Sequence, residues 1–299
     1  MFGSVLSTVY NAESVAAEDT VSFLTSVVQE LTFLTKLFER VFRLRKQWDE
    51  VSGLAQRIYE MEKSLDRVEA LLESQKEQRR EVAVAAGESA LKLDAVTVVT
   101  PGGEQLIEGL SVEIKEGEHT FIGGPNGVGK TSIFRVIAGL WSPKSGTVEI
   151  RKAQSERTFL LFLSQRPYLV PHLSIKEQVS YPRRGSEFND EDIGSVLRTV
   201  GIHDVIQSRG GIHDGNVIDG LSGGEIQRIG MARCLLHRPV FALLDECSSA
   251  VSADMTDVFF AQCIERNITL ITIAHDAELA KYHRQILKIS KAGWQLTSQ

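Results

Sequence analysis

The chain has 299 residues and a mass of 33.1 kDa, a length typical of about two domains. Hydrophobic residues make up 42% of it and charged residues 24%, which excludes a largely disordered protein. The net charge of −6 and the pI near 5.7 argue against a nucleic-acid partner. No stretch offers the roughly 18 uncharged apolar residues of a membrane-spanning helix, and three cysteines without a CxxC pair favour a reducing compartment.

Residues 1–82 carry the pattern of a long helix. They contain no proline and two glycines, and their apolar residues recur at alternating steps of three and four along one stripe. The stripe runs from Leu24 to Leu72, and from Val51 onward its spacing suits a short coiled-coil seam. We expect an amphipathic helix or helix pair packed on another element, with a self-associating coiled coil as the alternative. In either case the stripe must be buried.

A different pattern begins after residues 83–90, a run of small residues that we interpret as a linker. In residues 91–299, short β-type runs bounded by glycine alternate with helical stretches. This alternation is typical of an α/β domain with a mainly parallel core sheet.

Residues 124–131, with the sequence GPNGVGKT, fit the phosphate-loop pattern GxxxxGK[ST] between an apolar run and an amphipathic helix. Glycines let backbone N–H groups surround phosphates, and the helix N-terminus adds positive potential. We expect Lys130 to reach the β- and γ-phosphates and Thr131 to ligate Mg²⁺. The residues predicted to bind the nucleotide here are Gly124, Pro125, Asn126, Gly127, Val128, Gly129, Lys130, Thr131 and Ser132.

Two adjacent carboxylates, Asp245 and Glu246, end the apolar run that begins at Phe241. An acidic pair at the end of a strand is a weak signal alone and a stronger one downstream of a phosphate loop. We predict that Asp245 is a Mg²⁺ ligand and that Glu246 is the general base that activates the attacking water.

The sequence LSGGE at residues 221–225, followed by IQR, resembles the signature motif of ATP-binding cassette (ABC) ATPases. Gln165 and His275, each after an apolar run, resemble the family's Q-loop glutamine and switch histidine. The resemblance implies that Gln165 and His275 are catalytic and that Gln165 also ligates Mg²⁺. It further implies that the signature residues contact the ATP held by a second cassette; these residues are Ser222, Gly223 and Gly224.

The resemblance also implies a fold. We expect an ABC-type P-loop NTPase domain with a parallel core sheet, an antiparallel β subdomain and a helical signature subdomain, preceded by the long helical segment.

Several stretches resemble subfamily D, the peroxisomal half-transporters for fatty acids and their CoA esters. They are SQRPY at 164–168, the signature region at 221–233 and the region around the acidic pair at 237–254. The resemblance covers about residues 90–299 and, more loosely, residues 51–62. It implies an ATPase that powers transport of long or very-long-chain fatty acids or their CoA esters at the peroxisomal membrane, with the cassette facing the cytosol.

Two departures from the family pattern bear on function. Thr100 stands near the position where many members have an aromatic residue that stacks on adenine, and base–aromatic stacking is worth about 1–3 kcal/mol. Ser252 replaces an aspartate common in the family, although it matches subfamily D.

The third departure is that almost none of the subfamily's six-helix membrane domain is present. We therefore expect two partners, a second ABC half (identical or different) and a membrane domain in cis or in trans. Four interpretations stay open: a cassette subunit docked on a separate membrane protein, a truncated half-transporter, a soluble cytoplasmic ABC ATPase with a partner-binding arm, and a catalytically silent partner cassette.

Overall fold

The computed structural model describes residues 2–75, 79–84, 89–153, 157–215, 217–218 and 220–298. The chain separates into two compact units, unit 1 being Met1–Glu73 and unit 2 Ser74–Gln299.

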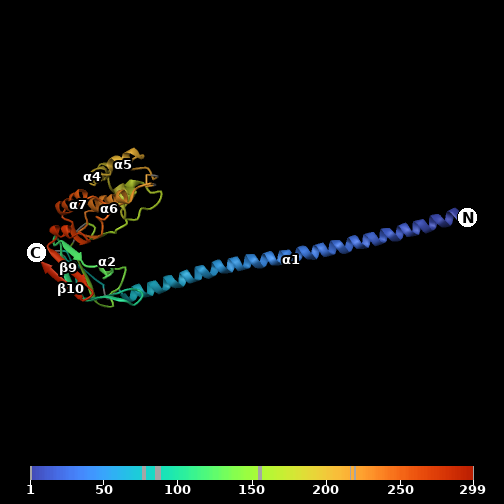
Figure 1. Ribbon diagram of the computed structural model, residues 1–299, viewed down its shortest axis with the longest axis horizontal. Helices are drawn as coiled ribbons and strands as arrows, with labels where there is room; N and C mark the ends of the chain where they lie inside the picture. The colour runs from blue at the N-terminus through green and yellow to red at the C-terminus, as the bar shows by residue number, and fades with distance from the viewer. Residues whose placement is uncertain are drawn as a thin grey trace. The chain divides into compact units, whose positions relative to one another are not determined.

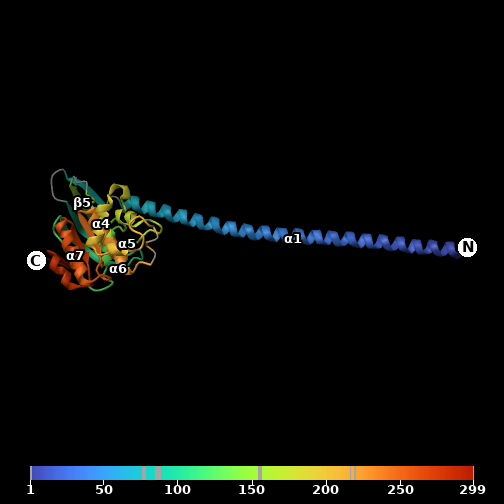
Figure 2. The same cartoon turned by 90° about the horizontal axis from the view of Figure 1, so that it is seen from above.

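Unit 1 is formed by one helix, α1 (Phe2–Gln75), which runs for 74 residues without a break (Figures 1 and 2). A single helix is thus present where a helix or a helix pair was expected. Every side chain from Val28 to Glu69 is exposed, so the apolar stripe has no partner within the part of the chain that the structure describes. Among the described residues, no helix has an apolar stretch long enough to cross a membrane.

The helix ends earlier than the sequence pattern predicted. Residues 79–82, which we assigned to the helical segment, belong to a strand, β1 (Arg79–Val84). This strand pairs in parallel with β5 (Ser145–Ala153), and Arg79 lies opposite Val148. The alternating valines of RREVAV favour a strand, and the pairing satisfies its backbone groups along one side. Of the predicted linker, residues 83–84 are strand and residues 85–88 lie outside the described residues.

Unit 2 contains two sheets. The four-stranded sheet has the order β1-β5-β2-β3, in which β2 is antiparallel to both of its neighbours. The six-stranded sheet has the order β10-β9-β4-β8-β7-β6 and is parallel except for β10, which makes its only antiparallel pairing, with β9. The remaining strands are β2 (Ala90–Val99), β3 (Gln105–Lys115), β4 (Thr120–Gly123), β6 (Leu160–Leu163), β7 (Phe241–Asp245), β8 (Thr269–Ile273), β9 (Gln285–Ser290) and β10 (Gly293–Ser298).

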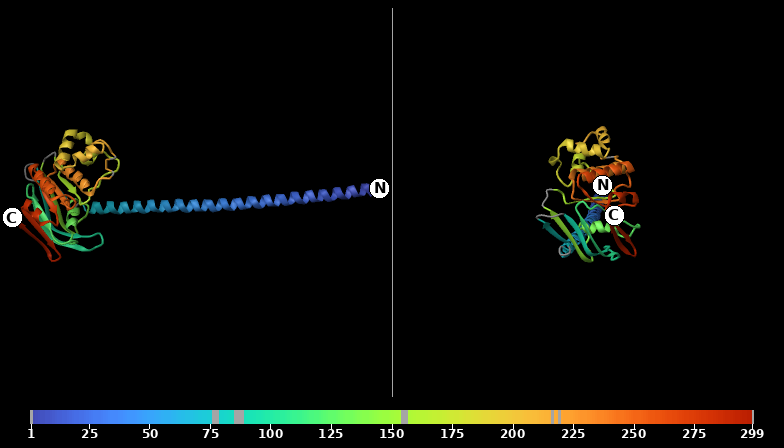
Figure 3. Two further views of the ribbon diagram at one scale, coloured as in Figure 1. Left: turned by 45° about the horizontal axis from the view of Figure 1, so that its top comes forward. Right: turned by 90° about the vertical axis from the view of Figure 1, so that its left-hand side faces the viewer.

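Helices pack around these sheets. In Figures 1 and 3, α4 and α5 lie at the end of unit 2 away from β9 and β10, with α6 and α7 between them. The α-helices are α2 (Lys130–Ile137), α3 (Ile175–Ser180), α4 (Asp190–Thr199), α5 (His203–Ser208), α6 (Gly223–His237) and α7 (Ala253–Glu265). Two 3₁₀ helices are η1 (Gly185–Glu187) and η2 (Ala277–Tyr282).

The central strands β7 and β8 are buried along their whole length, with apolar side chains on both faces. Continuous burial is expected of strands in a parallel sheet that has other elements on both sides. One apolar cluster lies between β7 and helices α6 and α7, and a second joins the other face of β7 to α2 and to the four-stranded sheet. The strand ends that carry the predicted site are therefore fixed by the core. This architecture confirms the expected ABC-type α/β fold.

Candidate functional site

Four neighbouring strands of the six-stranded sheet end at the same edge, in the order β4, β8, β7 and β6. All four run parallel, so the segments that follow them meet at this edge. Ligands of α/β proteins bind at the carboxyl ends of parallel strands. The residues that follow these strands are the predicted ones: the loop 124–131 after β4, His275 after β8, Asp245 and Glu246 at the end of β7, and Gln165 after β6.

The loop at residues 124–131 needs glycine at two positions for different reasons. Gly124 has φ 146°, and a Cβ there would lie 2.1 Å from the carbonyl oxygen of Ile289. Gly129 has φ 98°, and a Cβ there would lie 2.9 Å from Cβ of Leu106. The first contact is with backbone, which cannot move aside, so only glycine fits beside β9. The loop then leads directly into α2, which begins at Lys130.

The Lys130 side chain folds back over its own loop. Its Nζ donates hydrogen bonds to the carbonyl oxygens of Gly124 at 2.7 Å and Pro125 at 2.9 Å, and the residue is 6% exposed. Burial lowers the pKa of this ammonium, while the carboxylates of Glu246 and Asp245 act in the opposite direction. The cation is thus held within the loop that would surround a phosphate chain.

Asp245 and Thr131 form the next part of the site. The Thr131 hydroxyl donates to Oδ1 of Asp245 at 3.2 Å, and Asp245 is 7% exposed. Burial raises the pKa of this carboxyl, the hydrogen bond from Thr131 lowers it, and the nearby Glu246 raises it further. A hydroxyl and a carboxylate are hard oxygen donors of the kind that Mg²⁺ prefers, so these two side chains fit such an ion.

The Glu246 carboxylate is held between the two other predicted catalytic residues. Gln165 Nε2 donates to its Oε2 at 2.9 Å, and His275 Nε2 lies 2.9 Å from its Oε1. The Glu246 backbone has a left-handed φ of 50°, and its N–H donates to Ile273 O at 2.8 Å. The chain therefore turns sharply after Asp245 and aims the two carboxylates at different partners. The structure brings all three predicted catalytic side chains together.

Two cavities meet at Glu246. One, of about 440 Å³, lies beside α2 and is lined by Thr131, Gln165, Asp245 and Glu246 together with apolar side chains such as Phe134 and Phe162. The other, of about 290 Å³, contains His275 and residues that follow Glu246, from Ser248 to Thr256. Glu246 is thus accessible to a small molecule while Gln165 and His275 hold it in place.

The predicted signature residues start helix α6. Ser222 Oγ accepts from the Glu225 N–H at 3.3 Å, and the Glu225 carboxylate accepts from the Ser222 N–H at 2.6 Å, a capping box. A Cβ at Gly224 would lie 2.6 Å from Ala250 O, so the helix start packs closely on the segment after Glu246. Within the described residues, no hydrogen bond joins Ser222, Gly223 or Gly224 to the loop at 124–131. Their expected role at the site of a second cassette stays a prediction.

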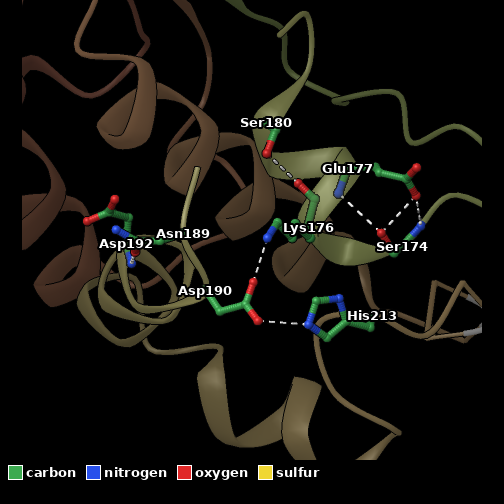
Figure 4. A network of polar contacts seen from close by, with 8 residues as sticks. All are labelled: Ser174, Lys176, Glu177, Ser180, Asn189, Asp190, Asp192 and His213. Atoms are coloured by element: carbon green, nitrogen blue, oxygen red, sulfur yellow. Dashed lines mark hydrogen bonds and ion pairs between the residues drawn. The ribbon is translucent and has the colours of Figure 1, made fainter. Parts of the chain in front are cut away.

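The loop before α6 is anchored to α3 and α4. Figure 4 shows Asp190, at the start of α4, accepting from Lys176 Nζ at 2.6 Å and from His213 Nε2 at 2.9 Å. The hydrogen bonds from Lys176 and then His213 lower the pKa of this carboxyl. The backbone N–H of Lys176 also donates to Ile212 O at 2.9 Å. The signature region is therefore connected to a hydrogen-bonded frame.

Gln227 is a positioning residue that the sequence analysis did not single out. Its Nε2 donates to Glu246 O at 3.3 Å, and its Oε1 accepts from Ala250 N at 3.2 Å. It is 1% exposed and connects α6 to the segment after β7. The sequence signal was a polar residue on the inward face of the signature helix.

Comparison with known proteins gives consistent matches. Residues 107–249 match the ABC transporter family. ATP-binding cassette sub-family D member 3 of Mus musculus is 35% identical over 286 residues, covering 87% of this chain and 42% of that protein. ABC transporter D family member 1 of Arabidopsis thaliana is 33% identical over 279 residues, covering 91% of this chain and 20% of that protein. Lysosomal cobalamin transporter ABCD4 of Mus musculus is 31% identical over 285 residues, covering 89% and 47%.

The chain spans less than half the length of each of these relatives. The share of this chain that they match exceeds what unit 2 alone contains, so the similarity reaches into α1. A solved structure of a bacterial Atm1-family ABC exporter with ATP bound matches with a TM-score of 0.62 at 23% identity, over 74% of this chain and 41% of that chain. The latter match shows a shared fold.

Proposed function

The chain belongs to the ABC transporter family through its ATP-binding domain, and on this premise we propose that Glu246 is the general base for ATP hydrolysis. The observation that carries the proposal is the Glu246 carboxylate held by Gln165 and His275. A carboxylate that accepts hydrogen bonds on both oxygens is fixed in orientation, and it can take a proton from a water in the adjoining cavity.

The phosphate chain of ATP would lie in the loop at residues 124–131. Lys130 would exchange its two carbonyl partners for phosphate oxygens, and the N–H groups at the start of α2 would donate to the same phosphates. Thr131 and Asp245 would hold Mg²⁺ with Gln165, and the ion would supply charge neutralisation to the phosphates. Glu246 then accepts the proton of the water that attacks the γ-phosphate, and His275 orients the carboxylate.

The site requires a second cassette under this proposal. ABC cassettes function as dimers with membrane domains, and the signature residues of one chain would contact the γ-phosphate bound by the other. Within one chain those residues make no hydrogen bond to the described phosphate loop. Closure of two cassettes over ATP would drive the membrane partner, and hydrolysis would reopen them.

For the transported molecule we propose long or very-long-chain fatty acids or their CoA esters, at the peroxisomal membrane. This rests on the motifs that resemble subfamily D. Cobalamin is the second candidate, because a relative 31% identical to this chain is named a lysosomal cobalamin transporter.

The first test is ATP hydrolysis by the purified full chain. We expect activity that needs Mg²⁺, that is lost in Glu246→Gln and that is kept in Glu104→Gln, an exposed glutamate remote from the site in sequence. Lys130→Ala should weaken nucleotide binding itself. An inactive wild-type chain that still binds ATP would favour a silent partner cassette, and undiminished binding by Lys130→Ala would contradict the phosphate-loop assignment.

The second test concerns membrane and substrate. An antibody to residues 280–298 should find the native protein in washed peroxisomal membranes of the source cells. Its ATPase activity in solubilised membranes should rise with a long-chain acyl-CoA and stay constant with cobalamin. Stimulation by cobalamin alone would establish the second candidate, and a purely cytosolic protein would favour a soluble ATPase.

A further inference from the structure

The apolar stripe of α1 has no partner in the part of the chain that the structure describes. The side chains at the stripe positions between residues 51 and 68 are all at least half exposed; they are Val51, Leu54, Ile58, Met61, Leu65 and Val68. So much exposed apolar surface in one line marks an interaction face.

The spacing of this stripe selects the kind of partner. The six residues alternate strictly in steps of three and four, so they occupy the a and d positions of successive heptads, with Val51, Ile58 and Leu65 at a. Leu44 continues the a series towards the N-terminus. A β-branched residue at a combined with leucine at d favours two parallel strands over three or four. Val51, Ile58 and Leu54 follow this rule.

The charges beside the stripe favour a second copy in parallel register. Arg57 is at a g position and Glu62 at the following e position, and in a parallel pair each g residue lies next to the e residue five places on in the partner. Two identical Arg57–Glu62 pairs would therefore form, one on each side of the seam. In an antiparallel pair e would face e, and the e positions Ala55, Glu62 and Glu69 include no basic residue.

Neither charged residue is satisfied within its own helix. Residues five apart do not face each other on one helix, and the described residues offer no ion pair to Arg57 or Glu62. By contrast, Arg43 lies 3.9 Å from Glu39 on the same helix. The unpaired charges are complementary only when two chains are placed side by side.

We propose that residues 44–72 of α1 form a parallel two-stranded coiled coil with a second copy of this chain. The coil joins two cassettes through their own chains and raises the concentration of each signature motif at the other cassette's ATP site. This last consequence rests on the proposed function, whereas the pairing itself does not.

The test measures the mass of the full chain in solution without nucleotide. Wild type should have twice the chain mass of 33.1 kDa, and Ile58→Lys should have that mass once. The matched control is Tyr59→Lys, which places the same charge one residue away, off the seam, at a side chain of similar exposure (58% against 63%). A monomeric wild type, or equal effects of the two variants, would overturn the proposal.

Register is tested by charge exchange and by cross-linking. Arg57→Glu should raise the dimer dissociation constant about tenfold, and Arg57→Glu combined with Glu62→Arg should restore it. Met61→Cys should form an interchain disulfide with oxidised glutathione, because equal d positions meet in a parallel coil, whereas Ile58 would face Met61 in an antiparallel one. Failure of the double variant to recover, or no cross-link, would overturn the parallel register.

The remaining outcomes separate this proposal from others. Wild type that stays monomeric but binds anionic phospholipid vesicles would assign the stripe to a lipid surface. If the coil forms as proposed, the specific ATPase activity of Ile58→Lys should fall on dilution while that of Tyr59→Lys stays constant. A chain that dimerises through α1 but lacks ATPase activity would leave the pairing intact and contradict only the proposed function.

Discussion

Two adjacent carboxylates at the end of β7 have different surroundings, and the difference suits different tasks. Asp245 is buried beside Thr131, and burial raises its pKa. Glu246 follows a left-handed turn and lies between Gln165 and His275, beside two cavities. A buried carboxylate next to a hydroxyl suits a cation, and a carboxylate that borders a cavity suits proton transfer.

Replacing the base should separate hydrolysis from binding. Glu246→Gln keeps the size of the side chain and removes the group that accepts the proton. We expect the hydrolysis rate to fall about 10²- to 10⁴-fold while ATP binding is retained. Single-turnover hydrolysis and equilibrium nucleotide binding, measured on the same preparation, check this. A variant that hydrolyses ATP at the wild-type rate would show that Glu246 is not the base.

The raised pKa of Asp245 predicts a pH effect on stability. The native state keeps a proton on this carboxyl to a higher pH than the unfolded state does, so the group's unfavourable contribution sets in as the pH rises through the interval between the two pKa values. Above that interval, the nucleotide-free Asp245→Asn protein should melt at a higher temperature than wild type, and the gain should shrink on acidification.

Addition of MgATP should reverse that order. The ion offsets the desolvated charge in wild type, whereas Asp245→Asn lacks the carboxylate ligand. Thermal unfolding with and without MgATP, at several pH values, measures both effects. If the asparagine variant is less stable than wild type at neutral pH without nucleotide, burial does not dominate at this carboxyl.

At the scale of elements, the site depends on how closely α6 packs on its neighbours. A Cβ at Gly230 would lie 2.5 Å from Cδ1 of Leu163 and 2.9 Å from Cγ of Pro167, in the strand and loop that flank Gln165. The absent side chain thus lets the signature helix approach the Q-loop segment. A rigid proline ring cannot move aside as the end of a leucine can.

Two glycine-to-alanine changes should therefore have opposite effects. Alanine has a higher helix propensity than glycine by about 1 kcal/mol. At Gly194 in α4 the nearest group is the end of the flexible Arg198 side chain at 3.4 Å, so Gly194→Ala should stabilise by about 0.5–1 kcal/mol.

Gly230→Ala meets Leu163 and Pro167 at distances below 3 Å, and we expect a net loss of about 1–2 kcal/mol. It should also lower ATPase activity, because it displaces the segment that carries Gln165. Denaturant unfolding of both variants checks the signs, and stabilisation by Gly230→Ala would contradict the close packing of α6.

The elements differ in how well the sequence predicted them. Lys130, Asp245, Gln165 and His275 follow short apolar runs, and strands with that pattern place them at one edge, as expected. The end of α1 and strand β1 were not predicted, because residues 79–84 have charged residues beside valines and their strand state depends on pairing with β5. Gln227 was missed because its role depends on contacts with Glu246 and Ala250.

At the scale of the whole molecule, the two units are stabilised in different ways. Unit 2 has two extensive apolar clusters, whereas the described side chains of α1 beyond residue 27 are exposed. An isolated helix gains little stability without packing. The length and pattern of α1 were predictable from the sequence, but its partner was not, because a stripe shows a face and not what covers it.

The units should respond to different ligands. Saturating MgATP at about 100 times its dissociation constant should stabilise unit 2 by about 2.7 kcal/mol, because the nucleotide binds only the folded cassette. The unfolding of α1 should depend on protein concentration instead. Circular dichroism reports the helix, and fluorescence of Trp141 and Trp294 reports unit 2 in a variant that lacks Trp48. A single transition that moves with both ligand and concentration would contradict this separation.

The two hydrogen bonds that Lys130 makes to Gly124 and Pro125 have a consequence for the reaction cycle. A buried ammonium without acceptors would be costly, yet here the departure of phosphate returns the cation to carbonyl oxygens of its own loop. The empty cassette is then a resting state that keeps its shape between turnovers. ATP enters by substitution, and its affinity reflects the difference between phosphate and carbonyl as acceptors. Lys130→Ala should for the same reason loosen the loop even when no nucleotide is near.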